Sequence, residues 1–218
     1  MCAPTLDGAR FPVDVYRAYR DGAAADIEFI IGIPGDELGV LRAFVGGQDS
    51  EKLIAAGAAD MRGCMDASGA ARAASPGDPG ADSRLLEQWN ALCACKTAAR
   101  LAEGGGNVHL LCWNEQPLIE NLGSGTVDAA AALLGNRDAS QQYGNVMDAD
   151  LSEVLQALLA KFIRGEALAL YPNEIKGVDA LEWAPFPMAL VASEGRLRCD
   201  AVGDSLTEVK NLLKFMVK

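Results

Sequence analysis

A carboxylate follows directly on an apolar run near the start of the chain. Residues 27–37 read IEFIIGIPGDE, in which Ile27–Ile33 predicts a buried strand and the next four residues predict a turn. In open α/β sheets, ligands and catalytic groups gather at the carboxyl ends of the strands. Glu37 is therefore the first candidate catalytic residue of this sequence.

A structural role for the same turn is an open alternative. Asp36 or Glu37 could cap the helix that begins there, because a carboxylate is favoured at a helix N-terminus. No stretch of the sequence reads G-x-S-x-G, and the single histidine is His109. An acid without a nucleophile indicates part of an enzyme.

The other reactive side chains give weaker signals. His109 lies within a second apolar run, where a packed strand residue is the alternative to a catalytic base. The six cysteines have no paired spacing, so we interpret most as buried thiols and metal binding as the weaker alternative. Cys112 is three residues from His109 along the strand, so their side chains are expected on opposite faces.

The elements that must position these residues alternate between helix and strand patterns. The predicted strands are 27–33 and 108–113, with a hairpin at 188–192 and 196–200. The predicted helices are 14–21, 38–45, Ser50 (as N-cap) to about 74, 83–103, 127–134, 149–164 and 205–217, with a flexible loop near 75–83. This order predicts an α/β fold with two parallel strands, which need further strands to complete a stable sheet.

Composition limits the classes of function. The chain has 218 residues, 50% of them hydrophobic, and a formal net charge of -11. This charge argues against a nucleic-acid partner, and no apolar run approaches the roughly 20 residues that cross a bilayer. No cationic start with an apolar core marks a signal peptide. We expect a cytoplasmic protein with no membrane partner and no cofactor.

The order of these signals resembles the C-terminal part of the type-B carboxylesterases, the cholinesterase-like branch of the α/β-hydrolases. The similarity covers nearly all of residues 1–218, and its parts are Asp7-Gly8 with Phe11-Pro12, Ile30-Ile31-Gly32 through Asp36-Glu37, Asn107–Trp113, Leu151-Ser152 through Phe162 and Gly165, and Trp183-Ala184-Pro185-Phe186. The resemblance implies a partial α/β-hydrolase fold: the last parallel strands of the sheet, a large helical insertion, and a C-terminal hairpin and helix.

The resemblance also implies a Ser-His-acid mechanism, with the acid after one strand and the histidine in the loop after the next. The acid position corresponds to Glu37. Residues 123–136 match the family's histidine segment in length and in the final Gly-Asn, and Thr126 occupies the histidine's place. A threonine cannot take up and release a proton near neutral pH. The family's G-x-S-x-G serine would lie upstream of this chain.

A second hydrolase motif is better explained as a helix cap. Residues 203–206 read GDSL, the nucleophile block of an unrelated hydrolase group, but only twelve residues follow Leu206. Ser205 with Glu208 matches a capping box.

Two hypotheses of function follow. In the first, the chain is the C-terminal part of a carboxylesterase-like serine hydrolase, inactive alone, whose partners are the N-terminal hydrolase portion and, once assembled, a small-molecule ester. In the second, it is a non-catalytic assembly module that associates with itself or with a companion chain through the exposed edge of strand 27–33.

Overall fold

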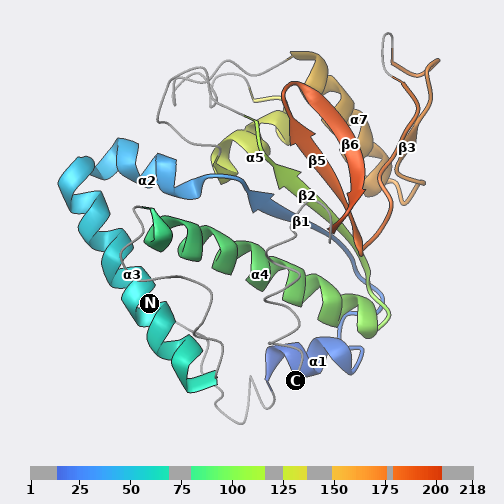
Figure 1. Ribbon diagram of the computed structural model, residues 1–218. Coiled ribbons are helices and arrows are strands. Elements are labelled where there is room, and N and C mark those ends of the chain that lie inside the picture. The colour runs from blue at the N-terminus through green and yellow to red at the C-terminus, as the bar shows by residue number, and fades with distance from the viewer. Residues whose placement is uncertain (1–13, 69–79, 116–124, 137–148, 176–178, 203–218) are drawn as a thin grey trace.

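The computed structural model describes residues 14–68, 80–115, 125–136, 149–175 and 179–202. Within these residues the chain alternates helices with strands (Figure 1). The helices are α1 (Val15–Arg20), α2 (Glu37–Val45), α3 (Gly47–Ser68), α4 (Ala81–Glu103), α5 (Thr126–Leu134) and α7 (Ala149–Ile163). The strands are β1 (Glu28–Pro34), β2 (Asn107–Trp113), β3 (Ala169–Leu170), β4 (Leu181–Glu182), β5 (Met188–Ser193) and β6 (Arg196–Ala201).

The main sheet has the strand order β1-β2-β5-β6. Strand β1 runs parallel to β2 in a register that pairs Glu28 with Asn107 and Pro34 with Trp113. Strand β5 also runs parallel to β2, whereas β6 is antiparallel to β5. The predicted mixed α/β fold with a parallel pair is thus confirmed at this level.

The strands that complete the sheet come from the C-terminal hairpin. The sequence predicted the hairpin but not its place beside β2, because strand pairing is a tertiary contact that leaves no local pattern. Glu194 and Gly195 form its turn with φ of 55° and 69°. Two consecutive left-handed residues match the twist of a tight hairpin. Strand β1 is left at the edge of the sheet among the described residues.

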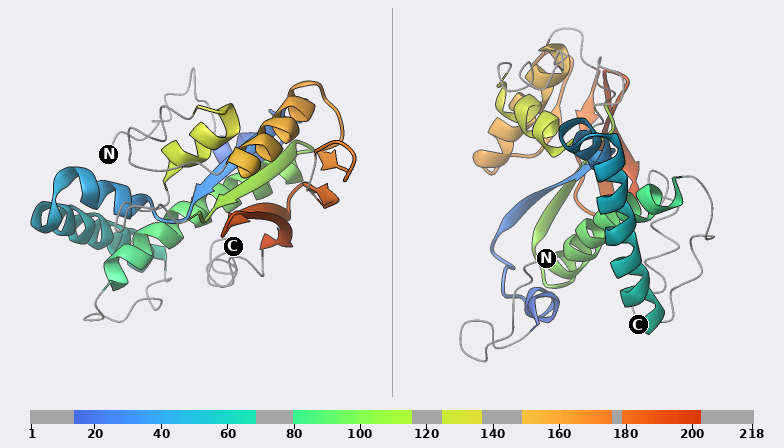
Figure 2. Two further views of the ribbon diagram at one scale, coloured as in Figure 1. Left: turned by 90° about the horizontal axis from the view of Figure 1, so that it is seen from above. Right: turned by 90° about the vertical axis from the view of Figure 1, so that its left-hand side faces the viewer.

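Helices cover the sheet on both faces (Figures 1 and 2). Helix α4 packs on one face, where Leu85, Leu92 and Leu101 share a buried cluster with Val108 and Leu110 of β2. The other face carries α5 and α7, whose apolar side chains share a second cluster with Leu111, Trp113 and Leu190. Alternate residues of β2 therefore serve different layers, which explains why the whole strand is apolar.

Two boundaries differ from the sequence prediction by more than one residue. Ser50 is not an N-cap, because α3 already starts at Gly47, and the Ser50 hydroxyl donates to the Gly47 carbonyl over 2.9 Å. The predicted loop at 75–83 is wrong for its last three residues, which begin α4. There Asp82 pairs with Arg62, and Ser83 accepts a hydrogen bond from Arg42, so contacts with α2 and α3 hold this turn in helical form.

Several predicted features lie outside the described residues. These are Asp7-Gly8 with Phe11-Pro12, the remainder of the loop up to residue 79, the GDSL string with Ser205, and the helix 205–217. Among the helices that are described, none is long and apolar enough to cross a membrane.

Candidate functional site

The structure brings Glu37 and Thr126 into direct contact at the carboxyl ends of β1 and β2. Glu37 Oε2 accepts a hydrogen bond from the backbone N–H of Thr126 over 2.8 Å and a second from its Oγ1 over 3.0 Å. Glu37 follows β1 by three residues, and Thr126 begins α5 after β2. The parallel register of the two strands places both positions at the same end of the sheet.

This contact depends on the close approach of α5 to α2. A Cβ atom at Gly125 would lie 2.7 Å from Val40 Cγ2, so a larger residue at the N-cap of α5 would push the two helices apart. Gly125 has no side chain to cap α5, and the Glu37 carboxylate takes over that function from α2. The alternative of a structural role for this turn is therefore supported. Asp36 caps α2 by accepting a hydrogen bond from Gly39 N over 2.7 Å, and Glu37 caps α5.

A second carboxylate of this region, that of Glu87, lies close to Asp36. The pKa of Glu87 is raised to about 7, first by burial and then by the charge of Asp36 and a hydrogen bond with its carboxylate, while Arg42 and Arg84 oppose the change. Glu87 lies on α4, so this contact links α4 to the turn after β1. The sequence analysis did not single out Glu87, because its partner lies 51 residues away.

His109 is not brought to Glu37. It lies four residues before Trp113, the last residue of β2. At about 3.3 Å per residue, this places it roughly 13 Å from the carboxyl end of the strand. The alternative of a packed strand residue is supported, since His109 is 5% exposed and makes edge contacts with the rings of Trp183 and Phe162.

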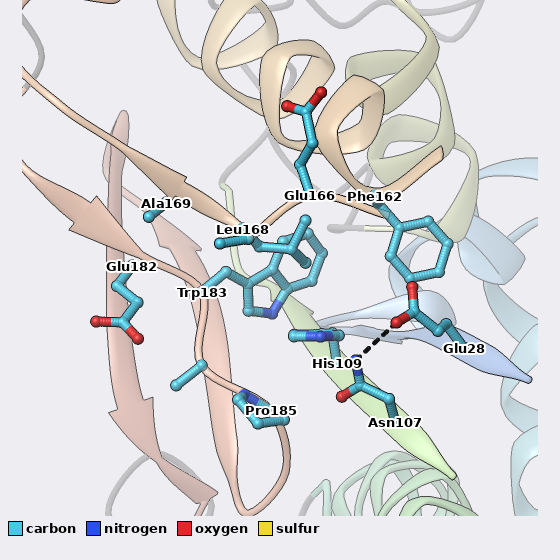
Figure 3. A pocket seen from close by; sticks show the side chains of 12 residues that line it. Glu28, Asn107, His109, Phe162, Glu166, Leu168, Ala169, Glu182, Trp183 and Pro185 are labelled. Atoms are coloured by element: carbon cyan, nitrogen blue, oxygen red, sulfur yellow. Dashed lines mark hydrogen bonds between the residues drawn. The ribbon is translucent and has the colours of Figure 1, made fainter. Parts of the chain in front are cut away.

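A small cavity lies beside His109, at the amino ends of β1 and β2 (Figure 3). Its volume is about 220 Å³, and His109, Phe162, Trp183 and three glutamates, Glu28, Glu166 and Glu182, are among the side chains that line it. The glutamates come from three separate segments, and sequence reasoning missed them. The one available signal was a lone polar residue, His109, inside an otherwise apolar strand.

The Trp183-Ala-Pro-Phe186 segment forms hydrogen bonds with the backbone of β2. Trp183 is 1% exposed, and its Nε1 donates to the carbonyl of Leu110 over 2.9 Å. The backbone N–H of Phe186 donates to the carbonyl of Val108 over 2.7 Å. The motif therefore has a structural role, because it extends the hydrogen bonding of β2 and forms one wall of the cavity beside His109.

Cys95 and Cys112 are buried thiols, and Cys93 and Cys199 are partly buried. Burial raises the pKa of Cys95 to about 12 and that of Cys112 to about 11, so both thiols stay protonated and unreactive at neutral pH. Cys112 belongs to the α4 face of the sheet and His109 to the α7 face, as their spacing predicted. Within the described residues, no three His, Cys, Asp or Glu side chains are grouped to hold a metal ion.

Comparison with known proteins gives no family assignment. No protein-family model matches the sequence, and no curated protein matches it either. The resemblance to carboxylesterases therefore stays a prediction from the sequence motifs.

Proposed function

We propose that this chain is the C-terminal part of a carboxylesterase-like α/β-hydrolase and that Glu37 is the acid of its Ser-His-acid site. In this proposal the serine nucleophile belongs to a preceding segment or to a companion polypeptide. The assembled protein acts on a small carboxylic ester, and the chain alone does not hydrolyse esters.

The contact between Glu37 and Thr126 carries this proposal. In a Ser-His-acid site, the carboxylate orients the imidazole and stabilises the imidazolium ion. It must therefore reach from the end of one strand to a residue that follows the next parallel strand. Glu37 Oε2 spans that gap with hydrogen bonds of 2.8 and 3.0 Å to Thr126, the residue that the resemblance aligns with the histidine.

The identity of residue 126 limits the activity that we propose. The threonine hydroxyl donates to Glu37, as an imidazole N–H would, but it cannot accept a proton from a serine near neutral pH. Loss of the general base typically removes several orders of magnitude in rate. We therefore infer that the assembled protein is a weak or altered hydrolase.

Ester turnover by the isolated chain tests the proposal that the serine nucleophile lies outside this chain. The hydrolysis of p-nitrophenyl acetate is measured for the wild-type chain, for Glu37→Gln and for the control Glu153→Gln, whose carboxylate is exposed on α7. We expect all three rates to equal the rate in buffer. A fast rate that Glu37→Gln abolishes and Glu153→Gln preserves would refute the proposal.

A specific observation also favours the second candidate function, assembly through the edge of β1. The Gly35 N–H donates to the Trp113 carbonyl over 2.8 Å. Because backbone groups point to the same side at every second residue of a strand, the backbone groups of Ile31 and Ile33 also face β2. The backbone groups of Ile30 and Gly32 then face the open edge. Ile27, at the start of this edge, is 49% exposed. We propose that another strand pairs there.

A proline at the open edge tests this second candidate. Gly32→Pro removes one outward N–H without removing a bond to β2, and a Cβ atom added at this position meets nothing within 4 Å. Gly32→Ala is the matched control. In sedimentation experiments we expect the wild type and Gly32→Ala to associate with rising concentration and Gly32→Pro to remain monomeric. A wild-type chain that stays monomeric at high concentration contradicts self-association.

A further inference from the structure

The turn that carries Glu37 has contacts with three helices. Glu37 accepts hydrogen bonds from Thr126 of α5, and the preceding residue, Asp36, caps α2. The start of α4 lies below α2 in Figure 1, and Glu87 of α4 hydrogen-bonds with the Asp36 carboxyl group. Two consecutive residues of one turn therefore bind to two different helices, so a change in one contact affects the other.

Helix α2 is the element that such a change would move. Helix α4 is buried along its whole length, whereas the buried residues of α2 are Leu38 and Gly39. The strand before the turn is also fixed, because the Gly35 N–H donates to the Trp113 carbonyl over 2.8 Å. A displacement of Asp36 is therefore passed on to α2 rather than to α4 or to β1.

The hydrogen bond between Asp36 and Glu87 requires a proton. Two ionised carboxylates are both acceptors, so one of the two groups must be protonated in order to donate. The pKa of Glu87 is raised to about 7, first by burial and then by Asp36, so Glu87 carries this proton below neutral pH. Asp36 is then the acceptor, as it is for the backbone N–H of Gly39.

Charged groups from α2, α3 and α4 surround Glu87 in the described part of the chain. Arg42 of α2 and Arg84 of α4 favour the ionised form of Glu87, and Asp36 disfavours it. The guanidinium of Arg42 also binds Glu51 of α3 over 2.8 Å, so its charge is divided between two carboxylates. The other ionic contact between α3 and α4 is Arg62 with Asp82, and the titratable residue that β2 directs towards α4 is Cys112.

We propose that Glu87 makes the contact between Glu37 and Thr126 dependent on pH near neutrality. Protonated Glu87 donates to Asp36 and holds the start of α2 against α4. Once ionised, Glu87 repels Asp36 and turns towards the two arginines, so α2 moves and Glu37 loses its hydrogen bonds. A displacement of about 1 Å is sufficient, because a donor and an acceptor about 3.6 Å apart no longer form a hydrogen bond. This inference concerns the contact itself and holds whether or not the contact belongs to a hydrolase site.

An NMR titration measures both contacts in one experiment. The carboxyl carbon of Glu87 reports its protonation, and the backbone amide of Thr126 reports the hydrogen bond to Glu37. We expect both signals to change with the same midpoint, near pH 7. Hydrogen exchange of the Thr126 amide, corrected for its intrinsic pH dependence, should be about tenfold faster above this midpoint than below it, which corresponds to the loss of one hydrogen bond.

The variant Glu87→Gln shows whether this titration comes from Glu87. The glutamine amide donates to Asp36 at every pH, so the Thr126 amide should not change around pH 7. The control Glu153→Gln removes an exposed carboxylate of α7, and its Thr126 amide should titrate as in the wild type. A Thr126 titration that persists in Glu87→Gln would overturn the proposal.

The variant Asp36→Asn tests the same coupling from the other side. It keeps the side-chain oxygen that caps α2 and removes the charge that Glu87 faces. The midpoint of the Glu87 carboxyl carbon should fall, and the response of Thr126 should disappear. A wild-type Glu87 that titrates near pH 7 without any response of Thr126 would contradict the coupling. These readouts involve no ester, so their failure is distinct from a failure of the proposed hydrolase function.

Discussion

The two ends of the parallel strands differ in how their polar groups are satisfied. At the carboxyl ends, Asp36 caps α2 and Glu37 accepts two hydrogen bonds from Thr126, so both carboxylates hold helix termini in place. At the amino ends, His109 is buried beside a cavity, and its Nδ1 has no hydrogen-bond partner among the residues that the structure describes. The acidic side chains at the end where the sequence predicts chemistry thus already have partners within the chain, whereas at the other end Nδ1 of His109 has none in the described segments. The place of a side chain in an α/β fold indicates where chemistry is expected. Its hydrogen bonds show whether the side chain already has a structural role.

The largest expected difference between the two ends is in how much a substitution lowers the free energy of unfolding. Trp183→Ala removes a side chain that is 1% exposed together with its hydrogen bond to Leu110, and should cost about 3–5 kcal/mol of unfolding free energy. Thr126→Ala, at the exposed carboxyl end, should cost less than about 1 kcal/mol. Urea denaturation measures both values. Similar losses for the two variants would show that the amino end is not the better packed one.

A pH-dependent effect is expected at the carboxyl end. The pKa of Glu87 is raised to about 7 from 4.5, first by burial and then by Asp36. The folded chain therefore keeps a proton that the unfolded chain releases, and stability falls as the pH rises between these values. Glu87→Gln should be more stable than the wild type at pH 8 by about 1–2 kcal/mol, with little difference at pH 4. Thermal unfolding measures both differences. An equal gain in unfolding free energy at pH 8 and at pH 4 would contradict the raised pKa of Glu87.

The capping role of Glu37 gives a smaller effect. Glu37→Gln keeps an oxygen acceptor but removes the charge at the N-terminus of α5, and should cost about 0.5–1 kcal/mol at pH 7. Glu153→Gln is the control and should cost less. If Glu37→Gln changes the unfolding free energy no more than the control does, the charge of Glu37 beside Thr126 does not stabilise the folded chain.

The smallest expected effect concerns His109. Because burial lowers its pKa in the folded chain, the unfolded chain takes up the proton first as the pH falls below about 6.5. The wild type should lose stability there, and His109→Phe should lack this part of the pH dependence. The readout is the difference in unfolding free energy between the two proteins from pH 7 to pH 5. A difference that does not change with pH would place His109 in contact with water.

Local patterns predicted most of the elements but not the cavity beside His109. The apolar runs located β1 and β2 within one residue at each end, and the helix expected from residue 127 begins at Thr126. The prediction placed a cap at Ser50 because a serine before a helical pattern is a common start signal. It missed that Gly46, with φ of 85°, lets α3 follow α2 almost directly.

Tertiary contacts account for what the sequence could not predict. The place of β5 beside β2 and the pairing of Glu87 with Asp36 join segments that are far apart in the chain. The cavity likewise combines Glu28, Glu166 and Glu182, each an ordinary surface glutamate when its own segment is considered alone. The Glu37 and Thr126 pair was within reach only because the family resemblance supplied the expected neighbour.

An imidazole introduced at position 126 tests the central claim most directly. Glu37 lies at hydrogen-bond distance from Thr126, the residue that follows β2, and we propose that it occupies the place of the acid in a hydrolase site. In Thr126→His, the NMR titration of the new imidazole should therefore give a pKa well above that in the double variant Thr126→His with Glu37→Gln, because the carboxylate stabilises the charged ring. The buried His109 signals provide an internal reference. The same pKa in both proteins would contradict the proposed hydrolase geometry.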